Sequence, residues 1–169
     1  MYRTILVAID DSHCARAALT EAIHLAASCN AHLEILHVTD YGFLQHELDQ
    51  GALSTQRLQL AGAGKTLLSR ASVIAKAANV PHTTALVDEM SVLGDIAAEV
   101  RKFAGTCGAQ IIVVGTHGRR GIRRLLVGSV AESLARECSV PVLLVREPIH
   151  AEGAATRPAQ QATEVPHDV

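Results

Sequence analysis

Five short apolar runs alternate with segments of helical periodicity, and this alternation restricts the fold more than any other feature of the chain. The runs are rich in Ile, Leu and Val, and they occupy residues 5–9, 33–38, 82–87, 111–114 and 140–145. Apolar strands that alternate with helices are typical of parallel sheets covered on both faces. The sequence therefore predicts one Rossmann-like, doubly wound α/β domain with a five-stranded parallel sheet in the order 3-2-1-4-5.

The helical segments are delimited by residues that commonly begin or end helices. Ser12 is an N-cap candidate for a helix that ends near residue 29, and Gly108 follows a helix that ends near residue 106. Ser129 and Glu132 have the spacing of a capping box at the start of a last helix over about 129–137. A helix over about 55–78 is expected to bury Leu60, Leu67, Ala71, Ile74 and Ala78.

The connection between the fourth strand and the last helix concentrates glycine and positive charge. It contains Gly115, Gly118 and Gly128, and four arginines lie within six positions, at 119, 120, 123 and 124. A cationic, glycine-bearing loop that leads into a helix N-terminus predicts an anion site, most plausibly for phosphates. The Ser129 hydroxyl would then either cap the helix or turn toward a bound phosphate. The alternative is a solvated loop without a ligand, since many such connections carry glycine and arginine.

The predicted strand order brings this loop close to a carboxylate. In a doubly wound sheet, ligands lie beyond the carboxyl ends of the strands, where the strand order reverses. The first and fourth strands are neighbours there, so Asp10 and the loop from Gly115 are expected to face one crevice. Of the nine histidines, His117 lies in this loop and has a positional argument for contacting a ligand. The other histidines are interpreted as surface or partly packed side chains.

Two other local patterns carry less weight. Gly64-Lys65-Thr66 is similar to the end of a phosphate-binding P-loop, but Gln59 stands where a glycine is required and no strand precedes it. It is interpreted as part of a helix, with Lys65 solvated. His46 and Glu47 would bind a metal ion only if a third ligand converged on them, which the sequence does not show.

Composition argues against several classes of function. A net charge of −2, a pI near 6.5 and the scarcity of aromatic residues argue against nucleic-acid binding. No apolar run has the roughly eighteen residues of a transmembrane helix, and no secretory signal is visible. A cytoplasmic protein without membrane insertion is therefore expected, with its four cysteines reduced. Residues 148–169 follow the domain at 1–147 and are predicted to form a disordered tail.

The chain resembles the universal stress proteins over about residues 1–147. The nucleotide-binding members of that family carry Gly-x2-Gly-x9-Gly-Ser/Thr, and Gly115, Gly118, Gly128 and Ser129 meet this spacing. The opening Ile5-Leu6-Val7-Ala8-Ile9-Asp10 and the later Leu36-His37-Val38-Thr39-Asp40 are also similar to the family's sequences.

This resemblance implies that ATP or a related adenine nucleotide binds in the crevice, with or without Mg²⁺. Asp10 is expected at the ribose, and the backbone around Ala8 and Val38 at the adenine. The residues expected at the phosphates are Gly115, Gly118, Gly128, Ser129 and Val130, with His117 beside them. Many members have glycine where this chain has Asp11, and a second carboxylate either weakens nucleotide binding or favours a bound Mg²⁺. Gln110 replaces a common acidic residue and is expected to matter for structure more than for ligand.

Two functional classes follow. The first is a regulatory, stress-response protein whose ATP occupancy alters its assembly or the activity of an unknown protein partner. The alternative is a slow ATPase or phosphoryl-transfer enzyme that uses the same site. No catalytic residue is assigned, because no catalytic base, Walker-type lysine or arginine finger is identifiable. A homodimer is expected through the edge strand at 140–145, by antiparallel pairing with its copy.

Overall fold

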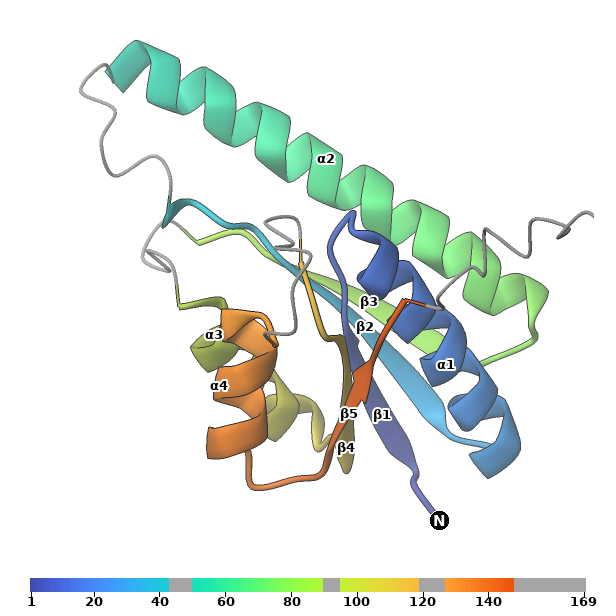
Figure 1. The fold of residues 1–169 in the computed structure, drawn as a ribbon. Helices are drawn as coiled ribbons and strands as arrows, with labels where there is room; N and C mark the ends of the chain where they lie inside the picture. Colours follow the sequence, from blue (N-terminus) through green and yellow to red (C-terminus); the bar gives the residue numbers. More distant parts are fainter. Residues whose placement is uncertain (43–49, 90–94, 119–126, 148–169) are drawn as a thin grey trace, which may run out of the picture.

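The computed structural model describes residues 1–42, 50–89, 95–118 and 127–147, with the backbone alone described for 50–53. Five parallel strands form one sheet in the order β3-β2-β1-β4-β5 (Figure 1). The strands are β1 (Thr4–Ala8), β2 (His32–Val38), β3 (His82–Val87), β4 (Ile111–Gly115) and β5 (Val142–Val145). The predicted parallel sheet and its strand order are confirmed.

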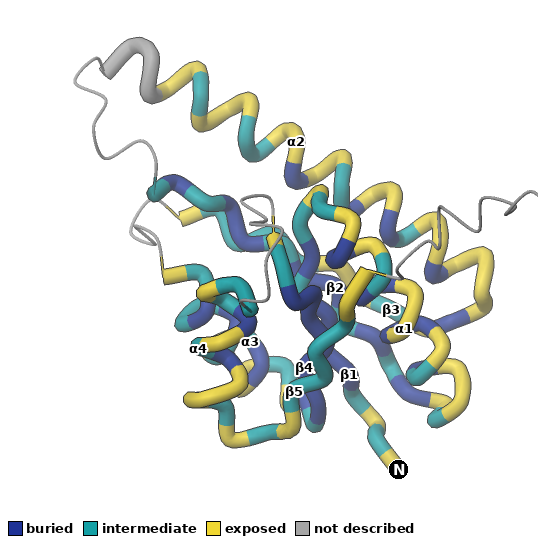
Figure 2. Tube along the Cα trace, viewed as in Figure 1, coloured by how far each residue is buried: buried dark blue, intermediate teal, exposed yellow. Residues whose placement is uncertain are grey.

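Four helices connect the strands and cover both faces of the sheet. The helices α1 (His13–Cys29) and α2 (Gln50–Ala77) lie on one face, and α3 (Ile96–Cys107) and α4 (Ser129–Glu137) lie on the other (Figure 1). Successive strand residues point to opposite faces, so Ile5 and Val7 join the first core and Leu6 joins the second. The central strands are accordingly buried (Figure 2). None of the described helices is both long and apolar enough to cross a bilayer.

Four strands differ from their predicted bounds, β2 and β4 by one residue each and β1 and β5 as follows. β1 ends at Ala8, although the Ile9 N–H still donates to the Leu36 carbonyl at 2.9 Å. β5 begins at Val142 instead of residue 140, because Pro141 has no N–H to donate. The Pro141 carbonyl nevertheless accepts from the Ile112 N–H at 3.0 Å, so the sheet contact begins there.

The predicted inward face of α2 is partly wrong. Ile74 is 51% exposed and Ala78 is exposed beyond the last helical residue. Leu68, Ala71 and Ala75 are the buried residues on this stretch of the helix. Leu60 and Leu67 were also expected to be buried, and both are half-buried.

Gly64 explains why the buried face of α2 differs from the predicted one. A Cβ atom built on Gly64 would lie 2.8 Å from a ring carbon of His37 and 2.9 Å from a methyl group of Leu86. The missing side chain lets the helix rest directly on β2 and β3, and this contact line continues through Leu68 and Ala75. The sequence pattern weighted large apolar side chains, so it placed the buried face too far toward Ile74.

Candidate functional site

The turn from β1 to α1 places Asp10 and Ser12 at the carboxyl edge of the sheet. The Ser12 N–H donates to Oδ1 of Asp10 at 3.0 Å. The Ser12 hydroxyl oxygen accepts from the Ala15 N–H at 3.1 Å, so Ser12 is the N-cap of α1 as predicted. The same hydroxyl donates to the carbonyl of His117 at 3.3 Å. This bond joins the turn after β1 to the loop after β4.

The loop after β4 also packs closely against this turn. A Cβ atom built on Gly118 would lie 2.9 Å from Oδ2 of Asp10. A Cβ atom built on Gly115 would lie 2.8 Å from the carbonyl carbon of Cys14 and 3.0 Å from the Ala15 nitrogen. The structure thus brings Asp10 and the first two glycines of the motif together. Gly115 faces the backbone of α1, which gives this glycine a packing role.

The opening of α4 lies beside the same loop. The Gly128 N–H donates to the Thr116 carbonyl at 2.7 Å, and the Glu132 N–H donates to the Gly128 carbonyl at 2.9 Å. Gly128 is therefore the N-cap, with φ −62° and ψ 150°, and Ser129 is the first helical residue. The prediction that Ser129 caps the helix is wrong by one position, because the first helical bond ends at the Gly128 carbonyl.

This N-cap distinguishes α4 from two other helices. Side chains cap α1 and α3, whereas Gly128 supplies no side-chain hydrogen bond to the first turn of α4. Backbone N–H groups at a helix N-terminus attract anions when no side chain satisfies them. Ser129 and Val130 belong to this first turn, so the start of α4 has the chemistry of a phosphate site.

The remaining expected residues lie at the same edge of the sheet. Nδ1 of His117 lies 3.0 Å from Oγ1 of Thr116, which is buried, so this imidazole is held against its neighbour. Ala8 ends β1, and Val38 ends β2. Their contact with an adenine base, like the ligand contacts of the glycines and Ser129, stays a prediction.

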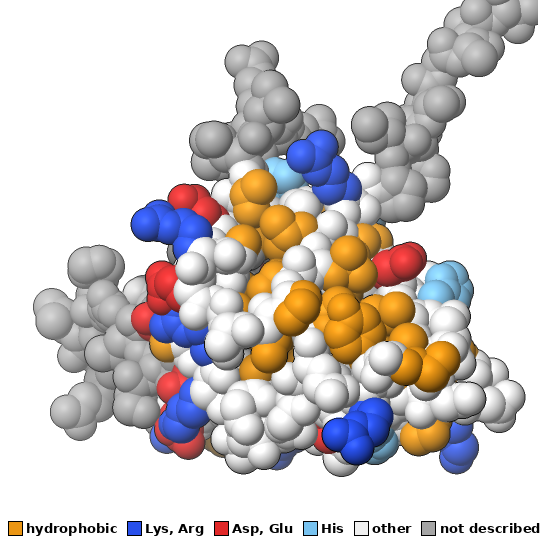
Figure 3. Space-filling model, turned by 90° about the horizontal axis from the view of Figure 1, so that it is seen from below, with side chains coloured by type: hydrophobic (Ala, Val, Ile, Leu, Met, Phe, Trp, Pro, Cys, Tyr) orange, Lys and Arg blue, Asp and Glu red, His pale blue; other side chains and the backbone are white. Residues whose placement is uncertain are grey.

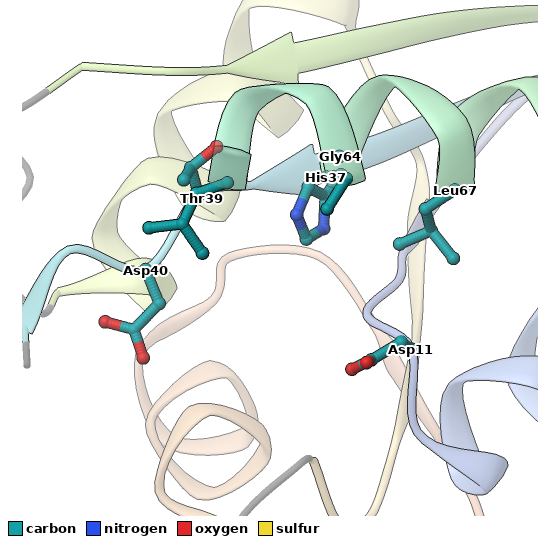
Figure 4. Close-up of a pocket in the computed structure, with 8 residues that line it drawn as sticks. Asp11, His37, Thr39, Asp40, Gly64 and Leu67 are labelled. Atoms are coloured by element: carbon teal, nitrogen blue, oxygen red, sulfur yellow. The ribbon is translucent and has the colours of Figure 1, made fainter. Parts of the chain in front are cut away.

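A hollow lies between the ends of β1 and β2 and the facing side of α2 (Figure 4). It measures about 380 Å³ when space open to solvent is included. Its lining residues are Asp11, His37, Thr39, Asp40, Leu60, Ala63, Gly64 and Leu67. Figure 4 shows the His37 ring next to Gly64, with Asp11 facing it across the hollow.

His37 is partly buried, as the interpretation of it as a surface or partly packed histidine allowed. Its Nδ1 lies 2.8 Å from the Ile9 carbonyl oxygen. Thr39 is only 2% exposed, and its Oγ1 has no hydrogen-bond partner among the described residues. The sequence analysis did not predict that these two residues line a hollow; the available signal was a histidine near the end of a strand, with a glycine in the helix that follows.

The interpretation of Gly64-Lys65-Thr66 as a helical segment is confirmed. All three residues lie within α2, where Lys65 is exposed and the Thr66 hydroxyl donates to the Gly62 carbonyl at 3.0 Å. Gln110 lies at the opposite edge of the sheet, where its Oε1 accepts from the Arg3 N–H at 2.6 Å. This bond agrees with the structural role expected for Gln110.

The cysteines and the candidate metal ligands add no second centre. All four cysteines are free thiols, and Cys14 is the buried one. Within the described part of the chain, no three His, Cys, Asp or Glu side chains gather to hold a metal ion. Some positions named in the sequence predictions lie outside the described residues. They are His46, Glu47, the four arginines at 119, 120, 123 and 124, and the tail at 148–169.

Comparisons with known proteins agree with the fold. Residues 1–146 match the model of the universal stress protein family. Universal stress protein YxiE of Bacillus subtilis is 30% identical over 153 residues, covering 86% of this chain and 100% of that protein.

Two solved structures share the fold. Universal stress protein UspA from Lactobacillus plantarum is 24% identical, with a TM-score of 0.76 and coverage of 86% of this chain and 98% of that one. A universal stress protein in complex with cAMP is 27% identical, with a TM-score of 0.61 and coverage of 86% and 98%. Because the family model matches residues 1–146 and the sheet order agrees, the chain belongs to the universal stress protein family.

Proposed function

We propose that this protein binds an adenine nucleotide, with ATP as the expected ligand, between the β1–α1 turn and the opening of α4. The observation that carries the proposal is the meeting of Asp10, Gly118 and the N-terminus of α4 where the strand order reverses. A carboxylate suits ribose hydroxyls, and helix amides without a side-chain cap suit phosphates. The relative solved with cAMP supports an adenine nucleotide as the class of ligand.

Each residue has a distinct role in this proposal. Asp10 binds the ribose, and the backbone of Ala8 and Val38 lies near the base. The residues around the phosphates are Gly118, Gly128, Ser129 and Val130, with His117 beside them and Gly115 in support. If Mg²⁺ accompanies the nucleotide, the phosphates and Asp11 would supply oxygen ligands, since Mg²⁺ sites commonly combine one or two carboxylates with substrate phosphates.

Nucleotide occupancy then serves regulation: it alters the protein's assembly or its binding to a partner in the stress response. The alternative is slow ATP hydrolysis at the same site. We expect turnover far below the ordinary enzyme range of about 1 to 1,000 per second. A rate within that range, abolished by His117→Ala or Asp11→Ala, would favour an ATPase. A cytoplasmic location stays a prediction for cell fractionation to test.

We also propose a homodimer through β5. This strand is a sheet edge, and its four residues are only half-buried. Unpaired edge strands are prone to pair with another strand, and the same strand of a second copy is self-complementary about a two-fold axis. Figure 3 shows a face of the molecule where apolar side chains gather and many charged side chains lie toward the rim. The dimer is proposed from the β5 edge alone.

Calorimetric titration of the full chain with ATP tests the nucleotide site. A Cβ atom on Gly128 would lie 3.2 Å from the Thr116 carbonyl oxygen, so Gly128→Val should distort the start of α4 and weaken binding. Gly105→Val is a matched control, because a Cβ atom on Gly105 meets nothing within 4 Å. Unchanged ATP affinity in a folded Gly128→Val protein would refute the assignment of the site.

A further inference from the structure

The hollow beneath α2 contains a histidine whose hydrogen bonding determines what it can recognise. Nδ1 of His37 lies 2.8 Å from the Ile9 carbonyl oxygen. A carbonyl oxygen only accepts hydrogen bonds, so Nδ1 carries the proton. In the neutral ring, Nε2 is then an acceptor. Within the described part of the chain, the Ile9 carbonyl is the hydrogen-bond partner of this ring.

The other polar groups of the hollow are also able to accept hydrogen bonds. Asp11 and Asp40 contribute carboxylates from the turn after β1 and the end of β2. Thr39 also lines the hollow and has a buried hydroxyl without a partner among the described residues. The α2 side of the hollow is apolar. The hollow therefore suits a flat or apolar group that carries hydrogen-bond donors.

Gly64 fixes the distance between the helix and the imidazole. A Cβ atom at position 64 would lie 3.3 Å from Nε2 and 2.8 Å from the neighbouring ring carbon of His37. A side chain there would push the ring out of place or cover Nε2. The glycine thus preserves both the position of the ring and the space beside its acceptor atom.

We propose that His37 is a specificity-determining residue of the nucleotide site, and that its Nε2 accepts a hydrogen bond from the amino group of the base. This inference rests on the proposed nucleotide site. An adenine nucleoside carries donors on the amino group of the base and on the ribose hydroxyls, and the ribose is already assigned to Asp10. His37 would thereby select ligands that donate a hydrogen bond at this position.

Two complementary substitutions separate the atoms of the imidazole. His37→Asn keeps an amide N–H near the position of Nδ1, where it can still donate to Ile9, but it removes the Nε2 acceptor. His37→Gln places an amide at the position of Nε2 and removes the donor at Nδ1. His24→Asn is a control, because His24 is an exposed histidine on α1. Circular dichroism would confirm that each variant is folded.

The experiment compares ATP with ITP by calorimetry at pH 8. ITP carries a carbonyl oxygen in place of the amino donor. The wild type should bind ITP about 3- to 10-fold more weakly than ATP, as expected for one lost hydrogen bond.

The discrimination should disappear in His37→Asn and persist in His37→Gln and His24→Asn. Equal discrimination in the wild type and a folded His37→Asn protein would overturn the role of His37. So would a wild type that binds ATP and ITP equally. A wild type that binds no ATP would instead remove the proposed function itself. ATP binding that depends on Gly128 but not on His37 would leave the function intact and reject only this inference.

Discussion

The carboxylate of Asp10 meets the backbone of Gly118 so closely that a Cβ atom on this glycine would stand 2.9 Å from Oδ2. Among the described glycines, positive φ is confined to Gly108, so the backbone conformation at 118 does not itself demand glycine. The requirement at this position comes from the neighbouring carboxylate. The motif glycine and the ribose-binding candidate are therefore a coupled pair.

Gly118→Ala should weaken ATP binding by displacing the Asp10 carboxylate. A lost hydrogen bond to a charged group corresponds to about 10- to 100-fold in affinity. Calorimetry of Gly118→Ala, Asp10→Ala and the double variant measures the coupling. If the two residues act together, Gly118→Ala has little further effect once Asp10 is replaced. Fully additive losses would show that Gly118 acts independently of Asp10.

Gly115→Ala should reduce the free energy of unfolding. The added Cβ would stand 2.8 Å from the carbonyl carbon of Cys14, which is backbone and cannot rotate away. Overpacking of this kind typically costs about 1–3 kcal/mol. Urea unfolding gives the value, with Gly62→Ala as the control because its Cβ would meet nothing within 4 Å. Wild-type stability in Gly115→Ala would mean that α1 shifts without cost.

The partly buried thiols should make stability depend on pH under alkaline conditions. Burial is the main cause that raises the pKa of Cys107 and of Cys138 above the ordinary 9.0. A raised pKa in the folded state favours the neutral thiol, so its contribution is present below pH 9 and is lost as the pH rises through the folded values.

Urea midpoints measured between pH 7 and 10.5 would show this effect. A Cys107→Ala, Cys138→Ala variant should lose part of the alkaline decline shown by the wild type. Iodoacetamide should also react more slowly with both thiols in the folded protein than in urea. Equal labelling rates in the two states would contradict the effect of burial.

Charge on the β5 edge should separate the homodimer. Leu143→Lys or Val145→Lys would place two like charges near the two-fold axis of an antiparallel pair. Their repulsion destabilises the pairing of the two strands. Light scattering at micromolar concentration should give a dimer for the wild type and a monomer for the variants. A wild-type monomer, or a dimer that both substitutions leave intact, would exclude this interface.

Most of the fold was predictable because the periodicity of the strands agrees with the positions of the residues that begin and end the helices. Ser12 and Gly108 mark helix ends by local rules, and the structure confirms both. One misreading concerns a contact between distant segments, and the other concerns a local hydrogen bond. The face of α2 depends on where Gly64 meets β2, and the start of α4 depends on which carbonyl accepts the first helical bond. Neither is encoded in the spacing of apolar residues.

The site was predictable to a similar depth. The strand order placed Asp10 beside the glycine loop without any knowledge of side-chain positions. The position of the His37 ring against Gly64 was not predictable, because it depends on where α2 packs over β2. The same holds for Thr39, since the lack of a partner for its hydroxyl is a property of the packed structure.

The contact of Gly115 with Cys14 has a consequence for how this protein can vary over evolution. Two segments a hundred residues apart share one small volume, which backbone atoms and the Cβ atom of Cys14 fill, so a side chain at 115 has to be met by a shift of α1. Position 115 should therefore stay glycine among homologues whichever side chain occupies position 14. A genetic selection for lost nucleotide binding should also recover substitutions at residue 115, and these would act by tilting the loop proposed to meet the ligand.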